Sequence, residues 1–329
     1  MKELRSGRRA MLAAPLALVA PALVKPAGAQ AAWPNRPVRM IVPWPAGGAA
    51  DLVGRLYAQA LAQRTGQPFI VENRGGATGT IGEQALIQAP ADGTTIMNQA
   101  TPISVTPALF AGQRHVPERE FIPVFQTMSV PQLVLVERNS PARNVAELIA
   151  LMRAADGDFA AGSSGIGSQQ HLVLELFLRQ AGVKANHIPY RGGAPALTDL
   201  IAGQIRLFFG NVNSAVAQVR DGQVRALAHT GARPRINALP DLPALSETLP
   251  GFATVEWNGI FVRVGTPAPV VERLSALLNE IVADAAFQQT LRASDLTAEP
   301  NTPEQFAGFF RSESAKWQSF VREANIRLE

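Results

Sequence analysis

Apolar runs typical of β-strands alternate with helical patterns along most of this chain, and glycine-rich turns join them. The first such unit runs from residues 38–42 through residues 43–48 into a helical pattern with apolar positions at Leu52, Val53, Leu56 and Ala60. This alternation is the signature of βαβ units on a mostly parallel sheet. The sequence therefore predicts an α/β protein.

A proline-rich stretch followed by a long extended segment divides the alternation into two lobes. The extended segment, residues 124–136, is expected to cross from one lobe to the other. We expect lobe 1 to comprise residues 32–127 and 234–329, which end in two long amphipathic helices, and lobe 2 to comprise residues 128–233. Ligands of open parallel sheets bind beyond the carboxyl ends of the strands, so two such lobes facing each other would form a ligand cleft.

Local signals predict where several elements begin and end. Gly182 follows a helical pattern in the position of a C′ glycine, and Pro195 is expected at the first position of a helix. Asn211 or Asn213 is expected to cap the helix that follows its strand. Residues 302–305, Thr-Pro-Glu-Gln, form a capping box with proline at the first helical position.

Residues 1–31 have the pattern of a secretory signal peptide. A basic stretch, Lys2–Arg9, precedes an apolar stretch, Met11–Val24, and small residues follow. The pattern predicts export with cleavage after Ala29 or Ala31, by the general secretory or the twin-arginine route. This segment accounts for the whole formal charge of +4. The rest of the chain is neutral overall, which argues against nucleic-acid binding through a broad basic surface.

The chain offers few residues for catalysis. It contains no cysteine, which excludes thiol catalysis and thiolate metal sites, and its four histidines lack the spacing of a zinc site. No dinucleotide or Walker motif is complete, and residues 162–166 fail as a nucleophile elbow because isoleucine stands where the last glycine belongs. We predict no catalytic residues, no metal and no cofactor. The remote alternative is an exported serine hydrolase that uses Ser164 or Ser168 with His171.

Four turns combine glycines, hydroxyl side chains and helix starts: residues 45–49, 75–80, 163–168 and 190–193. The start of a helix presents unpaired backbone N–H groups at the positive end of the helix dipole, which suits an anion. Each turn alone is an ordinary feature of an α/β protein. Four turns at corresponding places favour a cleft for a carboxylate or a similar anion. Asp51, in the first turn of the first helix, is placed to stabilise that helix start or to order its loop.

Short motifs follow one another in a recognisable order from Trp33-Pro34 onward. They include Ile41-Val42-Pro43, Gly47-Gly48, Asp51, Val71-Glu72-Asn73-Arg74, Asp92-Gly93, Pro189-Tyr190-Arg191-Gly192 and Trp257-Asn258-Gly259. In this order the chain resembles the tripartite tricarboxylate transporter substrate-binding family of periplasmic solute receptors, also called Bug proteins. The resemblance covers essentially the whole chain after the signal segment. It implies a type II periplasmic-binding-protein fold, in which each lobe is a mostly parallel sheet flanked by helices and the ligand cleft lies between the lobes.

The resemblance also implies a set of ligand-binding residues. In the family, the first βα loop and a loop of the second lobe grip one ligand carboxylate, largely through backbone groups and ordered water. The matching positions are Ala46, Gly47, Gly48 and Asp51 in lobe 1, and Ser164, Gly165 and Ser168 in lobe 2. Tyr190, Arg191 and Gly192 match a loop beside the cleft. Trp44 joins the set and stands where phenylalanine is usual in the family.

Two further residues are expected to support these loops rather than to contact the ligand. Asp199 matches an acidic position of the family that holds the loop of residues 190–192. His171, three residues after Ser168, lies on the helix that starts at the second-lobe loop, and we expect it to form a hydrogen bond to that loop.

We therefore expect a periplasmic, monomeric solute-binding protein that captures a small organic carboxylate. A dicarboxylate or tricarboxylate, an acidic amino acid and an aromatic acid all fit a carboxylate clamp. The expected partners are this ligand and the membrane permease subunits of a tripartite tricarboxylate-type transporter. The alternative is a carboxylate-sensing receptor that acts through a sensor protein without a dedicated permease.

Overall fold

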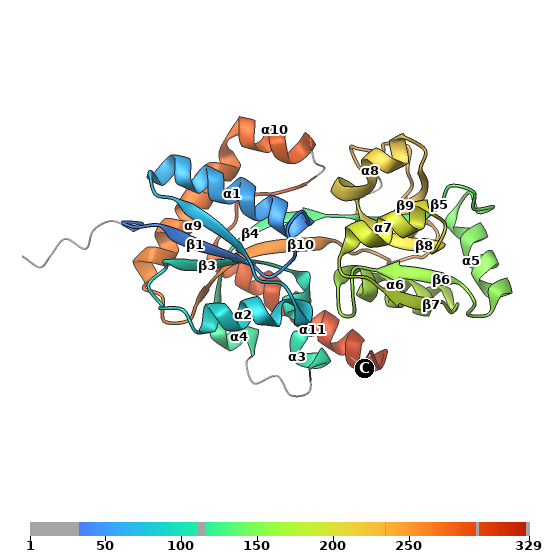
Figure 1. The fold of residues 1–329 in the computed structure, drawn as a ribbon, viewed down its shortest axis with the longest axis horizontal. Coiled ribbons are helices and arrows are strands. Elements are labelled where there is room, and N and C mark those ends of the chain that lie inside the picture. Colours follow the sequence, from blue (N-terminus) through green and yellow to red (C-terminus); the bar gives the residue numbers. More distant parts are fainter. Residues whose placement is uncertain (1–32, 111–115, 234, 294–295, 327–329) are drawn as a thin grey trace, which may run out of the picture. The chain divides into compact units, whose positions relative to one another are not determined.

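The computed structural model describes residues 33–110, 116–233, 235–293 and 296–326. The predicted signal peptide, residues 1–31, lies outside the described residues. Residues 33–329 form one compact unit, and this unit contains two five-stranded sheets with helices packed on them (Figure 1).

The first sheet has the strand order β2-β1-β3-β10-β4. Strand β1 pairs in parallel with β2 and β3, whereas β10 runs antiparallel to both β3 and β4. Four of the five strands therefore point the same way. The strands are β1 (Val38–Val42), β2 (Phe69–Asn73), β3 (Thr95–Ala100), β4 (Phe121–Val130) and β10 (Glu256–Arg263).

The second sheet repeats this plan with the order β7-β6-β8-β5-β9. Strand β6 pairs in parallel with β7 and β8, and β5 runs antiparallel to β8 and β9. Again four strands share one direction, which confirms the predicted two-lobed α/β fold with mostly parallel sheets. The strands are β5 (Gln132–Glu137), β6 (Ala160–Ser163), β7 (Asn186–Pro189), β8 (Leu207–Asn211) and β9 (Val224–His229).

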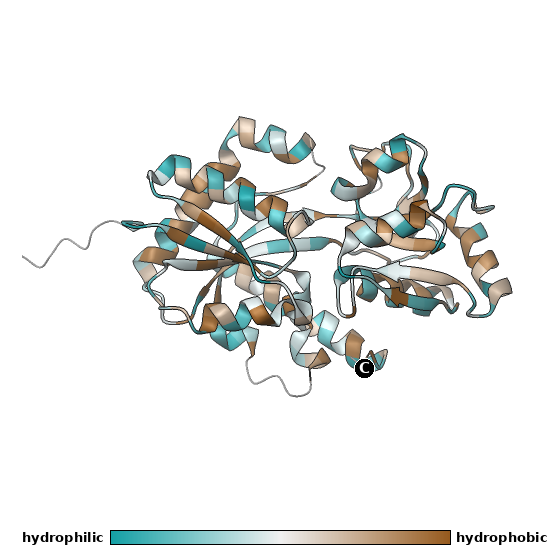
Figure 2. Cartoon of the chain, viewed as in Figure 1, coloured by the Kyte–Doolittle hydropathy of each residue, from teal (hydrophilic) through white to brown (hydrophobic). Residues whose placement is uncertain are grey.

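Helices cover the sheets, and buried apolar side chains pack between them. Figure 2 shows hydrophobic residues along the strands and along the helices that cover them. The longer helices are α1 (Ala49–Thr65), α2 (Thr80–Ile87), α5 (Val145–Ala155), α6 (Gln169–Ala181), α7 (Gly193–Ile201), α8 (Val212–Arg220), α9 (Ala268–Ala283), α10 (Ala285–Ala293) and α11 (Pro303–Glu323). Short helices lie at η1 (Ala77–Gly79), η2 (Thr101–Ser104), α3 (Thr106–Leu109), α4 (Pro117–Glu120) and η3 (Leu245–Glu247). The sequence predicted two long C-terminal helices, and α10 is an additional one.

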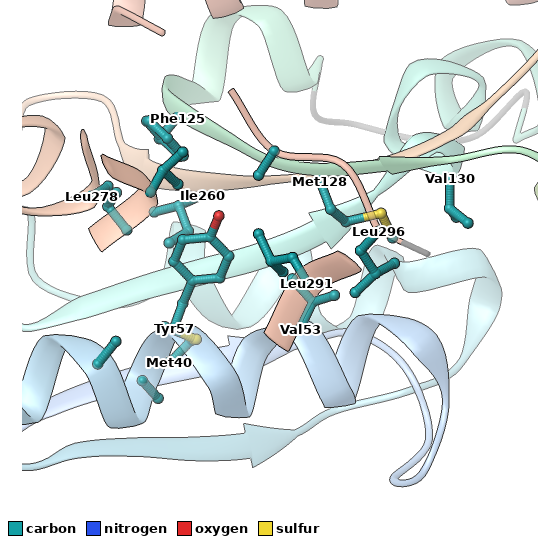
Figure 3. Packing of buried hydrophobic residues seen from close by; sticks show 14 of the residues in the cluster. Met40, Val53, Tyr57, Phe125, Met128, Val130, Ile260, Leu278, Leu291 and Leu296 are labelled. Atoms are coloured by element: carbon teal, nitrogen blue, oxygen red, sulfur yellow. The ribbon is translucent and has the colours of Figure 1, made fainter. Parts of the chain in front are cut away.

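Both faces of each sheet contribute to the core because neighbouring strand residues point to opposite faces. In the first sheet Ile260 packs with residues of α1 and α9, whereas the adjacent Phe261 packs with residues of α2 and α11. Figure 3 shows Val53 and Tyr57 of α1 pointing toward the strand residues on their side. The Tyr57 hydroxyl donates to the Thr127 carbonyl oxygen at 2.7 Å, which satisfies this buried polar group.

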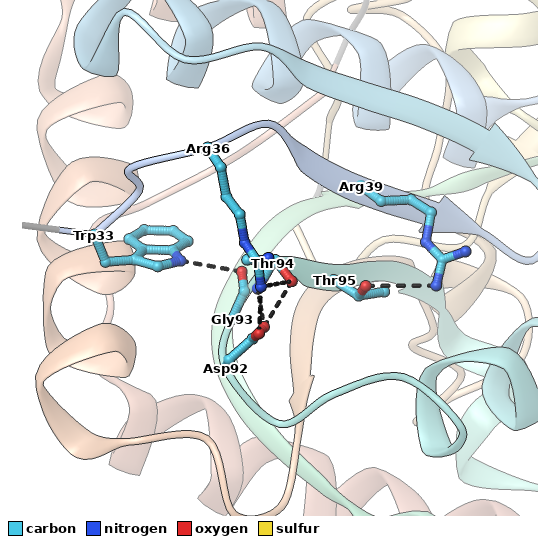
Figure 4. Close-up of polar contacts among 7 residues, drawn as sticks. All are labelled: Trp33, Arg36, Arg39, Asp92, Gly93, Thr94 and Thr95. Atoms are coloured by element: carbon cyan, nitrogen blue, oxygen red, sulfur yellow. Dashed lines mark hydrogen bonds and ion pairs between the residues drawn. The ribbon is translucent and has the colours of Figure 1, made fainter. Parts of the chain in front are cut away.

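The start of the described chain is fastened to the turn before β3 (Figure 4). The Trp33 indole N–H donates to the Gly93 carbonyl oxygen at 3.1 Å, and Arg36 pairs with Asp92 at 2.6 Å. Asp92 also accepts a hydrogen bond from the Thr94 N–H at 2.9 Å. These contacts set where β1 begins beside β3, and so they position the loop that follows β1.

The carboxyl ends of the two sheets meet at Pro131. Strand β4 ends at Val130 on the carboxyl-end edge of the first sheet. Strand β5 begins at Gln132, which pairs with Asn211 at the carboxyl end of β8. Because one residue separates the two strands, the loops that follow the same-direction strands of one sheet lie toward those of the other. The predicted lobe boundaries at residues 127 and 233 stay predictions.

Candidate ligand-binding site

Five helices begin at these two facing edges: α1 and α2 after β1 and β2, and α6, α7 and α8 after β6, β7 and β8. The N-cap residues of α1, α2 and α7 are Gly48, Gly79 and Gly192, and among the described residues no side chain caps these three starts. Helices α5 and α11 begin elsewhere, and Asn144 and Thr302 cap them. The facing edges therefore keep backbone N–H groups available to an anion.

The loop before α1 is ordered by Asp51. Its carboxylate accepts hydrogen bonds from the Gly47 N–H at 3.0 Å, from Arg55 Nε at 3.0 Å and from Asn73 Nδ2 at 2.9 Å. Burial opposes ionisation of this carboxyl group, but the three hydrogen bonds outweigh burial and lower its pKa. The sequence predicted Asp51 as a ligand-binding residue. The structure engages its oxygens within the protein, and Gly48 and the first turn of α1 remain as the donors of this loop.

Trp44 is held in place by polar contacts on both its side chain and its backbone. Its indole N–H donates to Gln99 Oε1 at 2.7 Å, and its carbonyl oxygen accepts from Asn73 Nδ2 at 3.0 Å. The side chain is half-buried, while Ala46, which follows it, is exposed. The indole thus forms a fixed wall beside the exposed loop.

In the second lobe the loop of residues 163–168 begins at β6 and ends at α6. Ser168 is the N-cap of α6, and its Oγ accepts the His171 N–H at 3.3 Å. The Ser164 hydroxyl is buried, and it has no hydrogen-bond partner within the described residues. Gly165 has a φ of +127°, and a Cβ there would lie 3.1 Å from the Tyr190 carbonyl oxygen, so this position requires glycine.

The loop of residues 190–192 lies beside the loop of residues 163–168. The Gly192 N–H donates to the Ser164 carbonyl oxygen at 3.1 Å. The Tyr190 hydroxyl donates to Asp199 Oδ2 at 2.7 Å, and burial together with this contact raises the pKa of Tyr190 to about 12. Arg191 is exposed, and no described residue forms an ion pair with it. Asp199 thus contacts the loop that it was predicted to hold.

Contacts connect all four predicted glycine-rich loops. Gly75 lies against Pro45, so that an added Cβ would sit 3.4 Å from the proline ring. Thr78 Oγ1 donates to the Ile166 carbonyl oxygen at 3.1 Å, which joins a loop of the first sheet to a loop of the second. The hydrogen bond from the Gly192 N–H to the Ser164 carbonyl oxygen joins the fourth loop, residues 190–193, to the loop of residues 163–168.

Two histidines stand behind the second-lobe loop. His171 Nδ1 accepts the Gly167 N–H at 3.1 Å, and His187 Nε2 lies 2.7 Å from Ser163 Oγ. Their rings are stacked, with centroids 4.1 Å apart and planes inclined by 8°. His171 was predicted to support this loop, but His187 and Ser163 were not. Their contact depends on the register of β7 against β6, in which Ala161 pairs with His187, and no local motif reveals that register.

Ser168 and His171, which the remote hydrolase alternative would use, form hydrogen bonds within their own loop. The acceptor nitrogen Nδ1 of His171 is occupied by the Gly167 N–H, and Ser168 Oγ accepts the backbone N–H of His171. Within the described ranges no cluster of three or more His, Cys, Asp or Glu side chains could hold a metal ion. In those same ranges no helix is both long and apolar enough to cross a bilayer.

A separate cavity of about 580 Å³ lies beside the crossing between the sheets. The end of β4, Pro131 and parts of residues 231–237 and 292–301 line it. None of the predicted ligand residues contributes to its walls. The sequence analysis assigned this cavity no role.

A family model described as "Tripartite tricarboxylate transporter family receptor" matches residues 53–326. The chain is 34% identical to the "UPF0065 protein in tcbD-tcbE intergenic region" of Pseudomonas sp. (strain P51), over 90% of this chain and 88% of that protein. It is 32% identical to "Protein BugT" of Bordetella pertussis, over 90% of this chain and 92% of that protein.

Solved structures of similar proteins share the fold. R. palustris Rpa4515 with adipate has a TM-score of 0.85 at 31% identity and covers 90% of this chain and 100% of that chain. Periplasmic binding protein BugD has a TM-score of 0.83 at 31% identity, with 90% and 100% covered. MatC (Rpa3494) from Rhodopseudomonas palustris with bound malate has a TM-score of 0.81 at 28% identity, with 88% and 99% covered.

Proposed function

The chain belongs to the tripartite tricarboxylate transporter receptor family, and we propose that it captures a small organic carboxylate in the periplasm and delivers it to the membrane subunits of a transporter of that type. The observation that carries this proposal is the connected set of four glycine-rich loops at two facing sheet edges, three of which lead into helices without a side-chain cap. Backbone donors in this arrangement suit an anion.

We assign the ligand contacts by position. One carboxylate binds the N–H groups of Gly48 and the first turn of α1 from one side, and the Ser164 hydroxyl beside Gly165 from the other. Trp44 bounds the pocket, and Tyr190 and Arg191 face the far end of the ligand. A dicarboxylate suits this pattern because the guanidinium of Arg191, which forms no ion pair within the described residues, can bind a second negative group.

The binding experiment uses protein that has been unfolded and refolded, so that any copurified ligand is removed. Thermal shifts and calorimetry are then measured with monocarboxylates, dicarboxylates, tricarboxylates, acidic amino acids and aromatic acids. A ligand at 100 times its Kd adds about 2.7 kcal/mol to the free energy of unfolding. Protein that binds none of these acids would overturn the proposal.

A pair of variants tests the site. We expect Ser164→Ala to weaken binding of the best acid about tenfold, because it removes a buried hydroxyl from the grip. Ser319→Ala, which changes a half-buried serine of α11 that contacts Glu323, is the matched control and leaves the affinity unchanged. Equal affinities for both variants would contradict the proposed contacts.

Delivery and export have their own tests. Uptake of the labelled acid by cells that lack this protein distinguishes transport from sensing. Loss of a transport receptor reduces uptake, whereas loss of a receptor that only senses the acid leaves uptake intact. Sequencing of the mature N-terminus is expected to start at Gln30 or Ala32, as cleavage after Ala29 or Ala31 requires. Retention of Met1 in periplasmic protein would contradict the signal-peptide assignment.

A further inference from the structure

We propose that Glu256 is a specificity-determining residue of the ligand site and that its free carboxylate oxygen binds an ammonium group of the ligand. The inference rests on the proposed function and names the substrate class of that site, an acidic amino acid rather than a plain dicarboxylate. It stands on the place of Glu256 between the two sheets, on an oxygen without a partner and on a buried acid without a counter-ion.

Glu256 lies where the two sheets face each other. It is the first residue of β10 in the first sheet, but its Oε2 accepts from Asn211 Nδ2 at 2.8 Å and from Gln170 Nε2 at 3.2 Å, both in the second lobe. Gln170 stands in the first turn of α6, which begins directly after the loop of residues 163–168. The carboxyl group therefore lies beside the helix start to which this proposed ligand loop leads.

The two oxygens of this carboxyl group differ. Oε2 is fixed by the amide groups of Asn211 and Gln170, whereas no described residue donates a hydrogen bond to Oε1. Glu256 is 7% exposed, and Oε1 is not among the fully enclosed polar atoms that lack a partner. Each carboxylate oxygen can accept about two hydrogen bonds. Oε1 is therefore a fixed acceptor that remains open to a ligand.

The charge of Glu256 also lacks a partner. No Lys, Arg or His side chain of the described residues pairs with it, and burial raises its pKa. Buried carboxylates in folded proteins are normally paired, because an isolated buried charge is costly. Asn211, the N-cap residue of α8, turns its amide to this carboxyl group instead of capping its own helix. A cation carried by the ligand would supply the missing counter-charge.

A second group without a partner indicates what carries this cation. The Ser164 hydroxyl, in the loop before α6, is buried without a partner and can donate to a carboxylate. Glu256 contacts the first turn of the same helix. The carboxylate and the ammonium group of an α-amino acid are attached to one carbon atom, so a single head group can bind both residues. With Arg191 assigned to a second negative group, the ligand is an acidic amino acid.

The test compares acids that differ only in the ammonium group. Glutamate is paired with glutarate, and aspartate with succinate, and calorimetry on the refolded protein at pH 7.5 gives each Kd. We expect the wild-type protein to bind the amino acid of a pair at least tenfold more tightly, as one charge-assisted hydrogen bond implies. If the best acid has another skeleton, its α-amino derivative completes the pair.

Glu256→Gln removes the charge and keeps the hydrogen bonds to Asn211 and Gln170. Its oxygen takes the place of Oε2, so its NH2 group occupies the position of Oε1 and faces the ammonium group as a second donor. We expect the Kd of the amino acid to rise at least tenfold, while that of the plain diacid is nearly unchanged. Malate and succinate form a further pair, whose ratio stays nearly constant because a hydroxyl group can accept from the NH2 group.

Glu118→Gln is the matched control, because Glu118 of α4 also accepts from a glutamine amide, Gln318 Nε2 at 3.3 Å. It should keep the wild-type ratios, and thermal unfolding checks that both variants are folded. An equal ratio in the wild type and in Glu256→Gln would overturn the inference. A wild-type protein that binds the plain diacid as tightly as the amino acid would overturn it too. Binding of none of the acids would instead contradict the proposed function.

Discussion

Thr78 Oγ1 donates a hydrogen bond to the Ile166 carbonyl oxygen at 3.1 Å, across 88 residues of sequence. Thr78 has a φ of +56°, a left-handed conformation that is strained for a β-branched residue. Strained residues of this kind persist where the surrounding structure holds them, often at functional sites. Here the hydrogen bond links the loop before α2 to the loop before α6.

Removal of this hydroxyl is expected to weaken ligand binding. Thr78→Ala loses a hydrogen bond of about 1 kcal/mol, so we expect the Kd of the best carboxylate to rise about fivefold in calorimetry. Thr78→Ser keeps the hydroxyl and serves as the control. Tighter binding by the alanine variant would mean that the contact belongs to the ligand-free arrangement.

Asp51→Asn is expected to destabilise the protein. The amide cannot accept all the hydrogen bonds that Gly47, Arg55 and Asn73 give to the carboxylate, so we expect a loss of about 1–3 kcal/mol in urea unfolding at pH 7. The lowered pKa means that this stability is present above the ordinary value of 3.8 and is lost as pH falls through the native pKa. Glu323→Gln, in an exposed pair with Arg179, should change stability by less than about 0.5 kcal/mol.

Alanine substitution at two glycines is expected to change the stability of the protein in opposite directions. Gly167 has a φ of +74°, and a Cβ there would lie 2.4 Å from Leu109 Cδ1, so Gly167→Ala should lower stability by about 2 kcal/mol or more. Gly308 lies within α11 with no atom near an added Cβ, and Gly308→Ala should raise stability by about 0.5–1 kcal/mol. Urea unfolding of both variants measures this, and a stable Gly167→Ala protein would refute the tight contact.

Glu256→Gln is expected to stabilise the protein at neutral pH. One oxygen of the buried Glu256 carboxyl group accepts from Asn211 Nδ2 at 2.8 Å and from Gln170 Nε2 at 3.2 Å, and burial raises its pKa above 4.5. The native state thus holds a proton that the unfolded chain releases, so the stability contributed by Glu256 falls as pH rises above 4.5. A glutamine oxygen accepts the same hydrogen bonds without a charge.

We expect a gain on the order of 1 kcal/mol at pH 8 that shrinks toward zero below pH 4.5. Thermal unfolding across this range measures it. Glu256→Leu, which leaves the Asn211 and Gln170 donors without an acceptor, should be less stable than the wild type at every pH. A pH-independent difference between Glu256→Gln and wild type would show that ionisation of Glu256 is not the cause.

The lowered pKa of His187 predicts acid sensitivity of the whole fold. Below pH 6.5, the ordinary pKa of histidine, His187 is protonated in the unfolded chain, whereas in the native state it stays neutral down to about pH 4. The free energy of unfolding should therefore fall as pH drops from about 6.5 to about 4. His187→Gln should flatten this part of the profile in urea titrations.

The sequence predicted those parts of the molecule that local patterns encode. The capping box at Thr302 and the C′ glycine at Gly182 are confirmed, with Gly182 at a φ of 62°. Pro195 was predicted at the first position of its helix, which is wrong because α7 begins two residues earlier at Gly193. Asn211 is the N-cap residue of α8, but its side chain bonds to Gln170 and Glu256 instead of capping the helix.

Long-range partners explain what the sequence could not predict at the candidate site. The ligand roles of all the predicted residues, Asp51 included, stay predictions. The contacts of Asp51 with its own loop depend in part on Asn73, which a separate strand supplies. The stacking of His187 on His171 depends on strand register. Such contacts join residues that no single window of sequence contains.

The helix starts without side-chain caps have an evolutionary consequence. Donors that belong to the main chain cannot be deleted by exchanging a side chain, so a grip built from them survives most point mutations. In the proposed site, changes of ligand must then come from the residues that we assign to the remainder of the pocket, such as Trp44 and Arg191. With the proposed site, a duplicated gene can diverge toward new acids while the main-chain contacts to the first carboxylate are inherited unchanged.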